Sequence, residues 1–395
     1  MKVLHIVKTA VGAAWAYHQV RVLCSLGIKV VVALPSATEG LAPHYQQAGA
    51  TVIPVNMNFG VQHLWRVPAA VAACRRLVKE VAPDLVHLHH VGTTLAMRMA
   101  LGKSSPIPRI FQVPGPLHLE HGFFAGLDTR LAGPQDYWIA TCQWTYQKYL
   151  QLGIPADRVF LAYAATDIKP FIGVRTGRLR NELGISSEVP LVGMVAYIYA
   201  PVWFLGQRQG LKGHEDFMMA VRLARQTLPG MRGVIIGGPW GNAARYESRL
   251  RDLGARMCNG SLTFVGNRTD VPVIYPDLDL AVVPSHSENC GGAVEPLLSG
   301  VPVVATNVGG LPDLIGDGKT GWLVPPHNPE ALAQAMLDAL QNGEEAQRRA
   351  AEGQNLARRL FDVERVGREI AGVYEKVLTR SARSNGDMLE SIAQS

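Results

Sequence analysis

The sequence of 395 residues has few of the features that would assign a protein to a class at once. It holds only five cysteines, widely spaced and without a C-x-x-C pair, so we expect neither a disulfide framework nor a cysteine-based zinc site. It contains no run of 18 apolar residues free of charge or of Pro and Gly breaks, so no membrane-spanning helix is expected. The first apolar segment is followed by a lone Gly turn without a G-x-G-x-x-G pattern, which argues against a dinucleotide-dependent dehydrogenase.

Concentrated positive charge is missing as well. The formal net charge is +6, yet Lys and Arg are dispersed along the chain. The densest basic group, residues 347–360, is typical of one solvated helix face, and no aromatic-rich basic motif accompanies it. Nucleic acid is therefore not an expected partner.

The amino-terminal segment superficially resembles a signal peptide. His5 and Lys8 interrupt its apolar part too early for that assignment, and a first buried strand over residues 2–7 explains the segment better. Because the odd, scattered cysteines also fit a reducing compartment, we expect a cytoplasmic location.

Short apolar segments alternate with helix-like segments along the whole chain, which predicts parallel sheets covered on both faces. Strands are predicted at residues 2–7, 28–35, 50–55, 83–90, 108–114, 136–142, 189–198, 232–238, 262–266, 278–285 and 301–306. The apolar pattern is diluted near residues 168–188 and then restarts. We therefore predict an α/β fold of two doubly wound domains facing a central cleft: residues 1–170, residues 171–365, and a carboxyl-terminal helix and tail over 366–395.

The most informative stretch is PSHSENCGGAVEPLLSGVPVVATNVGGLP, residues 284–312. In it, Glu288 and Glu295 bracket Gly291 and Gly292, and an apolar helix-like run follows. Glycines let a backbone approach a ligand closely, and the first amides of a helix suit a phosphate group. A carboxylate nearby could accept hydrogen bonds from sugar hydroxyls, so the pattern points to a sugar nucleotide. Pro296 is expected within the first helical turn, where it is tolerated.

This stretch resembles the donor-site signature of family 4 retaining glycosyltransferases, which have the GT-B fold. The match is close at SGVPVVAT, residues 299–306, but six residues separate Glu288 from Glu295 where the family usually has seven. The alternative is a Gly turn between two buried strands of any α/β protein. The resemblance is strong over residues 190–340 and diffuse over 1–165.

The resemblance implies a role for a strand–loop–helix segment that ends in Lys212 and Gly213. The Lys of such a segment neutralises the donor diphosphate and stabilises the leaving group. The family's arginine is absent from its usual place, where Tyr197 stands, and Arg208 from the same long loop is a candidate replacement. A solvated lysine at a helix start is the alternative for Lys212.

The remaining site residues follow from the same resemblance. His118 would contact the donor sugar near its anomeric centre, with His121 as the competitor, and Asn267 or Arg268 would meet the base. Gly12 would lie where backbone meets the donor or acceptor, although Ala13 replaces the second glycine usual there. The predicted donor-binding residues are Gly12, Arg208, Lys212, Arg268, Glu288, Asn289, Gly291, Gly292, Ala293 and Glu295; the predicted catalytic residues are His118, Glu288 and Lys212.

Two further patterns could hold a metal ion. His87, His89 and His90 cluster near a strand end, and alternation puts His87 and His89 on one face. No matching carboxylate or cysteine set is evident, so the sequence predicts no metal site there. The D-x-D pattern at residues 277–279 precedes an apolar strand, which favours a capped turn over a metal site.

The resemblance implies a metal-independent retaining transferase without a cofactor. Its donor would be a nucleotide-diphospho-sugar, UDP-linked in preference to GDP-linked, and its acceptor a glycan, glycolipid or lipid-linked hydroxyl in polysaccharide or glycoconjugate biosynthesis. Trp203 and Phe204 beside basic residues suggest peripheral contact with a membrane, with packing of this loop on the protein as the alternative. The rival functions are a UDP-sugar 2-epimerase of similar architecture and a non-catalytic two-lobed sugar-binding protein.

Overall fold

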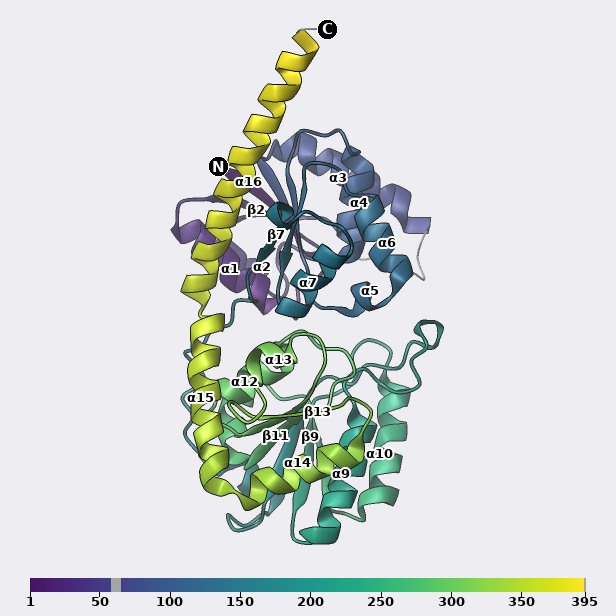
Figure 1. Ribbon diagram of the computed structural model, residues 1–395, viewed down its shortest axis with the longest axis vertical. Helices are drawn as coiled ribbons and strands as arrows, with labels where there is room; N and C mark the ends of the chain where they lie inside the picture. The colour runs from purple at the N-terminus through teal and green to yellow at the C-terminus, as the bar shows by residue number, and fades with distance from the viewer. Residues whose placement is uncertain (58–64, 394–395) are drawn as a thin grey trace. The chain divides into compact units, whose positions relative to one another are not determined.

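The computed structural model describes residues 1–57 and 65–393, with side chains throughout except those of Phe204 and residues 384–393. The chain divides into two compact units (Figure 1). The first contains Met1–Asp167 together with the chain from Phe361 onward, and the second contains Ile168–Leu360. The carboxyl-terminal helix, which the sequence analysis set apart as residues 366–395, thus belongs to the first unit.

The first unit is built on a parallel sheet of seven strands in the order β3-β2-β1-β4-β5-β6-β7. Its strands are β1 (Lys2–Ile6), β2 (Lys29–Leu34), β3 (Thr51–Pro54), β4 (Leu85–Leu88), β5 (Arg109–Gln112), β6 (Asp136–Ala140) and β7 (Val159–Leu161). Alternate strand residues face opposite sides of the sheet, as Val3 and Leu4 do in β1, and each side carries its own apolar core.

Helices cover both faces of this sheet. They are α1 (Ala14–Ser25), α2 (Ala42–Gln47), α3 (Val67–Val81), α4 (Val91–Leu101), α5 (Leu117–Glu120), α6 (Gly122–Arg130), α7 (Gln143–Gln151) and α16 (Val363–Ala393). The predicted helix near residues 64–81 corresponds to α3, and residue 64 lies outside the described part. In Figure 1, α16 runs beside α1, and Tyr374 and Ile370 of α16 share a core with Val20 and Leu23 of α1.

The second unit repeats the architecture with a six-stranded parallel sheet in the order β10-β9-β8-β11-β12-β13. Its strands are β8 (Leu191–Val195), β9 (Arg232–Ile236), β10 (Leu262–Gly266), β11 (Leu280–Val283), β12 (Val303–Thr306) and β13 (Trp322–Val324). Its helices are α8 (Arg178–Leu183), α9 (His214–Thr227), α10 (Ala244–Cys258), α11 (Val271–Ile274), α12 (Gly291–Leu298), α13 (Leu311–Leu314), α14 (Pro329–Gln341) and α15 (Gly343–Phe361).

The prediction of two parallel-sheet α/β domains is therefore confirmed. The sequence analysis missed β7 and β13, which have only three residues each and so carry too short an apolar pattern. Asp277, the first acid of the D-x-D pattern, accepts hydrogen bonds from the amides of Gly177 and Leu179, so it caps the start of α8, about 100 positions earlier in the sequence, and not a local turn. Among the described residues, no helix is long and apolar enough to cross a membrane.

Candidate functional site

A pocket of about 470 Å³ opens at the carboxyl ends of β8 and β11 in the second unit. These strands are neighbours in the sheet although β9 and β10 come between them in the sequence, so the chain leaves them in opposite directions. Such a switch point is where open α/β sheets bind ligands. Residues that lie at the strand ends and in the loops after them form the wall, including Val195, Pro284, Lys212, Gly292 and Glu295.

The loop before α9 delivers Lys212 to this pocket. Gly213 follows it as the N-cap of α9 with a left-handed φ of 70°. A Cβ at this position would lie 1.9 Å from the carbonyl oxygen of Pro284, so glycine allows the loop to pack directly on the end of β11. The amide of His286 donates to the carbonyl of Leu211 at 2.7 Å and joins the same two segments.

The Lys212 ammonium forms an ion pair with Glu288, with 2.5 Å between Nζ and Oε2. Glu288 is 8% exposed and also accepts hydrogen bonds from Ser285 Oγ at 3.2 Å and from the amide of Asn289 at 3.1 Å. A lysine ammonium has three N–H donors, and this pair uses one. The other donors of Lys212 can therefore reach ligand oxygens while Glu288 holds the side chain in place.

Glu295 presents a second carboxylate to the pocket from within α12. Among the described residues, no hydrogen bond or ion pair joins its side chain. Burial raises the pKa of Glu295 above the usual carboxyl range. A carboxylate that is desolvated but unpaired gains from hydroxyl donors supplied by a ligand.

The helix that carries Glu295 differs from the prediction. α12 begins at Gly291, so Pro296 is its sixth residue and lies inside the helix, and the prediction that Pro296 marks the first turn is wrong. Proline is tolerated there because α12 ends at Leu298 and because the carbonyl four residues earlier belongs to Gly292, which has no side chain to crowd it further. Glu295 consequently lies in the second turn of this helix.

The amides at the start of α12 are available only in part. The amide of Ala293 already donates to the carbonyl of Cys290 at 3.0 Å. Gly291 and Gly292 line the pocket, whereas Ala293 and Asn289 do not. A Cβ on Gly292 would come within 2.8 Å of the Val283 side chain and 3.1 Å of the Glu288 carboxylate, so glycine keeps this corner of the pocket narrow.

The pocket also contains cationic and aromatic residues from other loops. Arg268 lines it, but its guanidinium is paired with Asp270 at 2.8 Å and with Glu182 at 2.7 Å. Both carboxylates raise the pKa of Arg268. Arg208 is exposed and does not line the pocket, so its contact with a diphosphate stays a prediction, as does a contact of Arg268 with a base.

Two tyrosines that the sequence analysis did not consider support the site. Tyr199 lines the pocket, and burial raises its pKa while the nearby charge of Lys212 lowers it. Tyr246 of α10 accepts a hydrogen bond from the amide of Gly210 at 2.7 Å and donates to Glu215, which fixes the loop before Lys212. No motif marks either tyrosine, because their roles arise only when the loop folds onto α10.

His118 and Gly12 belong to the first unit. His118 lies on α5, where its Nε2 is 3.2 Å from the hydroxyl of Tyr149 and 3.5 Å from Asp128. Burial alone would raise the pKa of Asp128, but Arg98 and His118 lower it to about 2. Gly12 has a φ of 82° in the turn between β1 and α1, as a Gly turn requires. The predicted donor contacts of both residues stay predictions.

Two family profiles match consecutive parts of the chain. The one described as Glycosyltransferase Family 4 matches residues 12–169, and the one described as Glycosyl transferases group 1 matches residues 201–356. Together they match most of the chain between residues 12 and 356, and the second includes every lining residue of the pocket from Lys212 onward.

Several curated relatives carry the name D-inositol 3-phosphate glycosyltransferase. The protein of Acidothermus cellulolyticus is 29% identical over 82% of this chain and 76% of its own length. That of Mycobacteroides abscessus is 33% identical over 46% of this chain. That of Corynebacterium kroppenstedtii is 32% identical over 57% of this chain. The chain spans 39% and 49% of the last two relatives, so less than half of each is matched.

Solved structures share the fold. The Anabaena protein HepE, determined in complex with UDP, aligns with a TM-score of 0.75 and 21% identity over 95% of this chain and all of its own. The sucrose-phosphate synthase of Thermosynechococcus elongatus aligns with a TM-score of 0.77 and 18% identity over 96% of this chain and all of its own.

Proposed function

Since the chain belongs to the family 4 glycosyltransferases, we propose that it transfers a sugar from a nucleotide-diphospho-sugar to a hydroxyl acceptor, with retention at the anomeric carbon. The observation that carries this proposal is the convergence of Lys212, Glu288, Gly291, Gly292 and Glu295 on one pocket at the switch point of the second sheet. A cation and glycines whose backbone a ligand can approach closely suit a diphosphate, and an unpaired carboxylate suits the hydroxyls of a ribose.

Each group has a place in the reaction. Glu295 accepts hydrogen bonds from the ribose hydroxyls, and the spare donors of Lys212 with the backbone of Gly291 and Gly292 contact the diphosphate. The bond from the anomeric carbon to the phosphate oxygen breaks, and a bond from that carbon to the acceptor oxygen forms on the same face. The acceptor proton passes to the departing diphosphate, whose charge Lys212 stabilises.

Glu288 positions Lys212 in this scheme and contacts the sugar from the same loop. The ion pair with Lys212 holds the Glu288 carboxylate at the pocket. Glu288 reaches the pocket from the loop after β11 and Glu295 reaches it from inside α12, so both can serve one site although only six residues separate them. His118 is proposed to act on the donor sugar as the family resemblance implies. No metal ion and no cofactor enter this scheme.

The donor is proposed to be UDP-linked, since HepE, which shares the fold, was determined with UDP and with UDP-glucose. The acceptor is proposed to be a glycan or a lipid-linked hydroxyl in glycoconjugate biosynthesis at the cytoplasmic side of a membrane. Trp203 is 84% exposed in the loop before Lys212. This exposed apolar side chain supports the proposal that the loop contacts an apolar acceptor or a lipid surface.

A thermal-shift panel of UDP, GDP, ADP and TDP sugars tests the donor assignment. A ligand that binds only the folded protein stabilises it by about 2.7 kcal/mol at one hundred times its dissociation constant. We expect UDP sugars to raise the unfolding temperature most. If no sugar nucleotide of the panel raises the unfolding temperature, the proposal of a nucleotide-sugar transferase is contradicted. Conversion of the sugar in the absence of any acceptor would indicate an isomerase instead.

The affinity for the donor is expected to depend on pH through Glu295. Ribose hydroxyls that donate to the ionised carboxylate lower the raised pKa of Glu295 in the complex. Donor binding is therefore expected to weaken as pH falls through the pKa of Glu295 in the free protein and to be pH-independent above it. Calorimetric titration with an intact UDP-sugar checks this, because its diphosphate has no proton to gain in that range.

The control for this titration is the Glu295→Gln variant, which should bind the donor weakly and without that pH dependence. Because a raised carboxyl pKa means that ionisation costs folding stability as pH rises, the variant should not be less stable than the natural protein at neutral pH. If the pH dependence of donor binding is the same in Glu295→Gln as in the natural protein, Glu295 does not contact the donor.

A further inference from the structure

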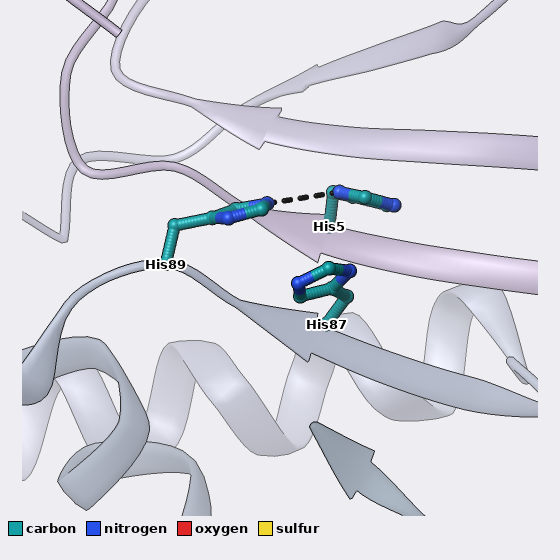
Figure 2. A group of neighbouring side chains, drawn as sticks. All are labelled: His5, His87 and His89. Atoms are coloured by element: carbon teal, nitrogen blue, oxygen red, sulfur yellow. Dashed lines mark hydrogen bonds between the residues drawn. The ribbon is translucent and has the colours of Figure 1, made fainter. Parts of the chain in front are cut away.

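Three histidines meet at the switch point of the first sheet, at the carboxyl ends of β1 and β4. His5 of β1 is the register partner of His87 in β4, and His89 follows directly after β4. All three side chains are fully buried. Figure 2 shows the three imidazole rings lying together. The ring centroids of His87 and His89 are 4.4 Å apart in a stacked arrangement, and those of His5 and His87 are 4.7 Å apart with the rings tilted. The alternation in the sequence placed His87 and His89 together but could not reveal His5.

The three imidazoles and Tyr374 of α16 form a chain of hydrogen bonds. His89 Nε2 lies 3.0 Å from His5 Nδ1, which is the contact drawn in Figure 2. His5 Nε2 lies 3.1 Å from the hydroxyl of Tyr374, and that hydroxyl lies 2.5 Å from His87 Nδ1. The two remaining ring nitrogens, His87 Nε2 and His89 Nδ1, are buried and make no hydrogen bond of ordinary length, and the Gln112 side chain lies beside both rings.

These groups cannot satisfy one another when they are neutral. Each neutral imidazole carries one N–H and one lone pair. The chain of bonds can run in either direction. In both directions one end keeps an unused N–H and the other an unused lone pair, which is costly in a buried site.

A bound cation would use one lone pair on each of the three rings, so that no ring lone pair would remain unused. We propose that His5, His87 and His89 bind one metal ion of the class that prefers imidazole nitrogen, represented by Zn²⁺, through His5 Nδ1, His87 Nε2 and His89 Nε2. One nitrogen from each ring already lies within 4.8 Å of the others. Ligand nitrogens of a tetrahedral zinc site lie about 3.4 Å apart, since each is about 2.0–2.1 Å from the metal. The 3.0 Å between His5 and His89 is therefore close to the distance required.

The surroundings offer acceptors for the ring N–H groups that would face away from the ion. Ligating histidines usually donate their second N–H to an oxygen, which fixes the ring. His5 Nε2 and His87 Nδ1 both face the Tyr374 hydroxyl, whose oxygen can accept two bonds. The side chain of Gln112 lies beside His87 and His89, and its amide oxygen, which already accepts a hydrogen bond from Gln19, has a second lone pair for His89 Nδ1. Binding therefore needs a change of tautomers and a rotation of the His87 ring out of its stack on His89, and no proton enters or leaves the three rings.

The ion would act as a structural link. It would join β1, β4 and, through Tyr374, the carboxyl-terminal helix that completes the first unit. His90, the third histidine of the sequence cluster, caps α4 and is not part of this group. This proposal does not depend on the proposed transferase activity.

Metal analysis of the purified full-length protein tests the proposal directly. Protein prepared from cells grown with added Zn²⁺ should retain about one equivalent per chain after desalting, and chelation should lower its unfolding temperature. Co²⁺ loaded in place of Zn²⁺ should give the visible absorption of a tetrahedral site with nitrogen ligands. No retained Zn²⁺, or an unfolding temperature that neither chelation nor Zn²⁺ changes, would overturn the proposal.

Two variants locate the ion. A second possible cluster, Asp216, His286 and His327, lies in the second unit, and His327 is exposed there. Zn²⁺ should be lost in His89→Gln and kept in His327→Gln. Loss in His327→Gln with retention in His89→Gln would assign the ion to the other cluster and overturn the proposal. Should His89→Gln fail to fold, the Co²⁺ spectrum of the natural protein and the Zn²⁺ content of His327→Gln still decide the question.

Discussion

Replacing Lys212 with alanine is expected to lower the rate of sugar transfer at least tenfold, and about a hundredfold if the ammonium acts mainly on the leaving diphosphate. The reason is that Lys212 is the cation that the end of β11 and Glu288 together hold in the donor pocket, with spare donors for phosphate oxygens. Steady-state kinetics with the preferred UDP-sugar measure the effect. The loss should appear mainly in kcat, because charge on the diphosphate grows as its bond to the sugar breaks.

The matched control is Lys319→Ala, which removes an exposed lysine of the same unit that does not line the pocket. It should transfer sugar at the natural rate. Lys212→Ala also leaves Glu288 without its ion-pair partner, so circular dichroism and the unfolding temperature must show that the variant is folded. Unchanged turnover in folded Lys212→Ala would refute the role given to Lys212.

Replacing Gly213 with alanine is expected to abolish donor binding and to destabilise the protein by about 2–5 kcal/mol. About 1–2 kcal/mol comes from the left-handed backbone, and about 1–3 kcal/mol from overpacking. The added Cβ would lie 1.9 Å from the carbonyl oxygen of Pro284, so the loop must move away from β11 and take Lys212 with it. Thermal unfolding should show a loss of about 2–4 °C per kcal/mol, and calorimetry should show no binding of the UDP-sugar.

Gly206→Ala separates the two causes, because Gly206 lies in the same loop with a φ of 73° and a Cβ there would meet nothing within 4 Å. This control should cost only the backbone term of about 1–2 kcal/mol and leave donor binding intact. Equal losses in the two variants would show that the contact with Pro284 does not position Lys212.

Much of the fold was predictable from the sequence, because a parallel sheet buried on both faces leaves short apolar runs between helical segments. The segments around β8, β9, β10, β11 and β12 were all identified in this way. The donor loop was predictable because glycines and carboxylates cluster in a short stretch, and both glutamates and both glycines line one pocket.

Other features depend on contacts between distant residues. Lys212 and Glu288 are 76 positions apart, and nothing in either local sequence indicates that they form an ion pair. His5 meets His87 only because β1 and β4 are neighbours in the sheet. Pro296 was misplaced because the rule that confines proline to a first helical turn takes no account of a helix that ends two residues later.

A crystal structure with an intact UDP-sugar tests the central claim most directly. The account predicts the ribose at Glu295 and the diphosphate against Lys212, Gly291 and Gly292, at the carboxyl ends of β8 and β11. A nucleotide bound elsewhere, or bound with these groups out of hydrogen-bonding reach of it, would contradict the account.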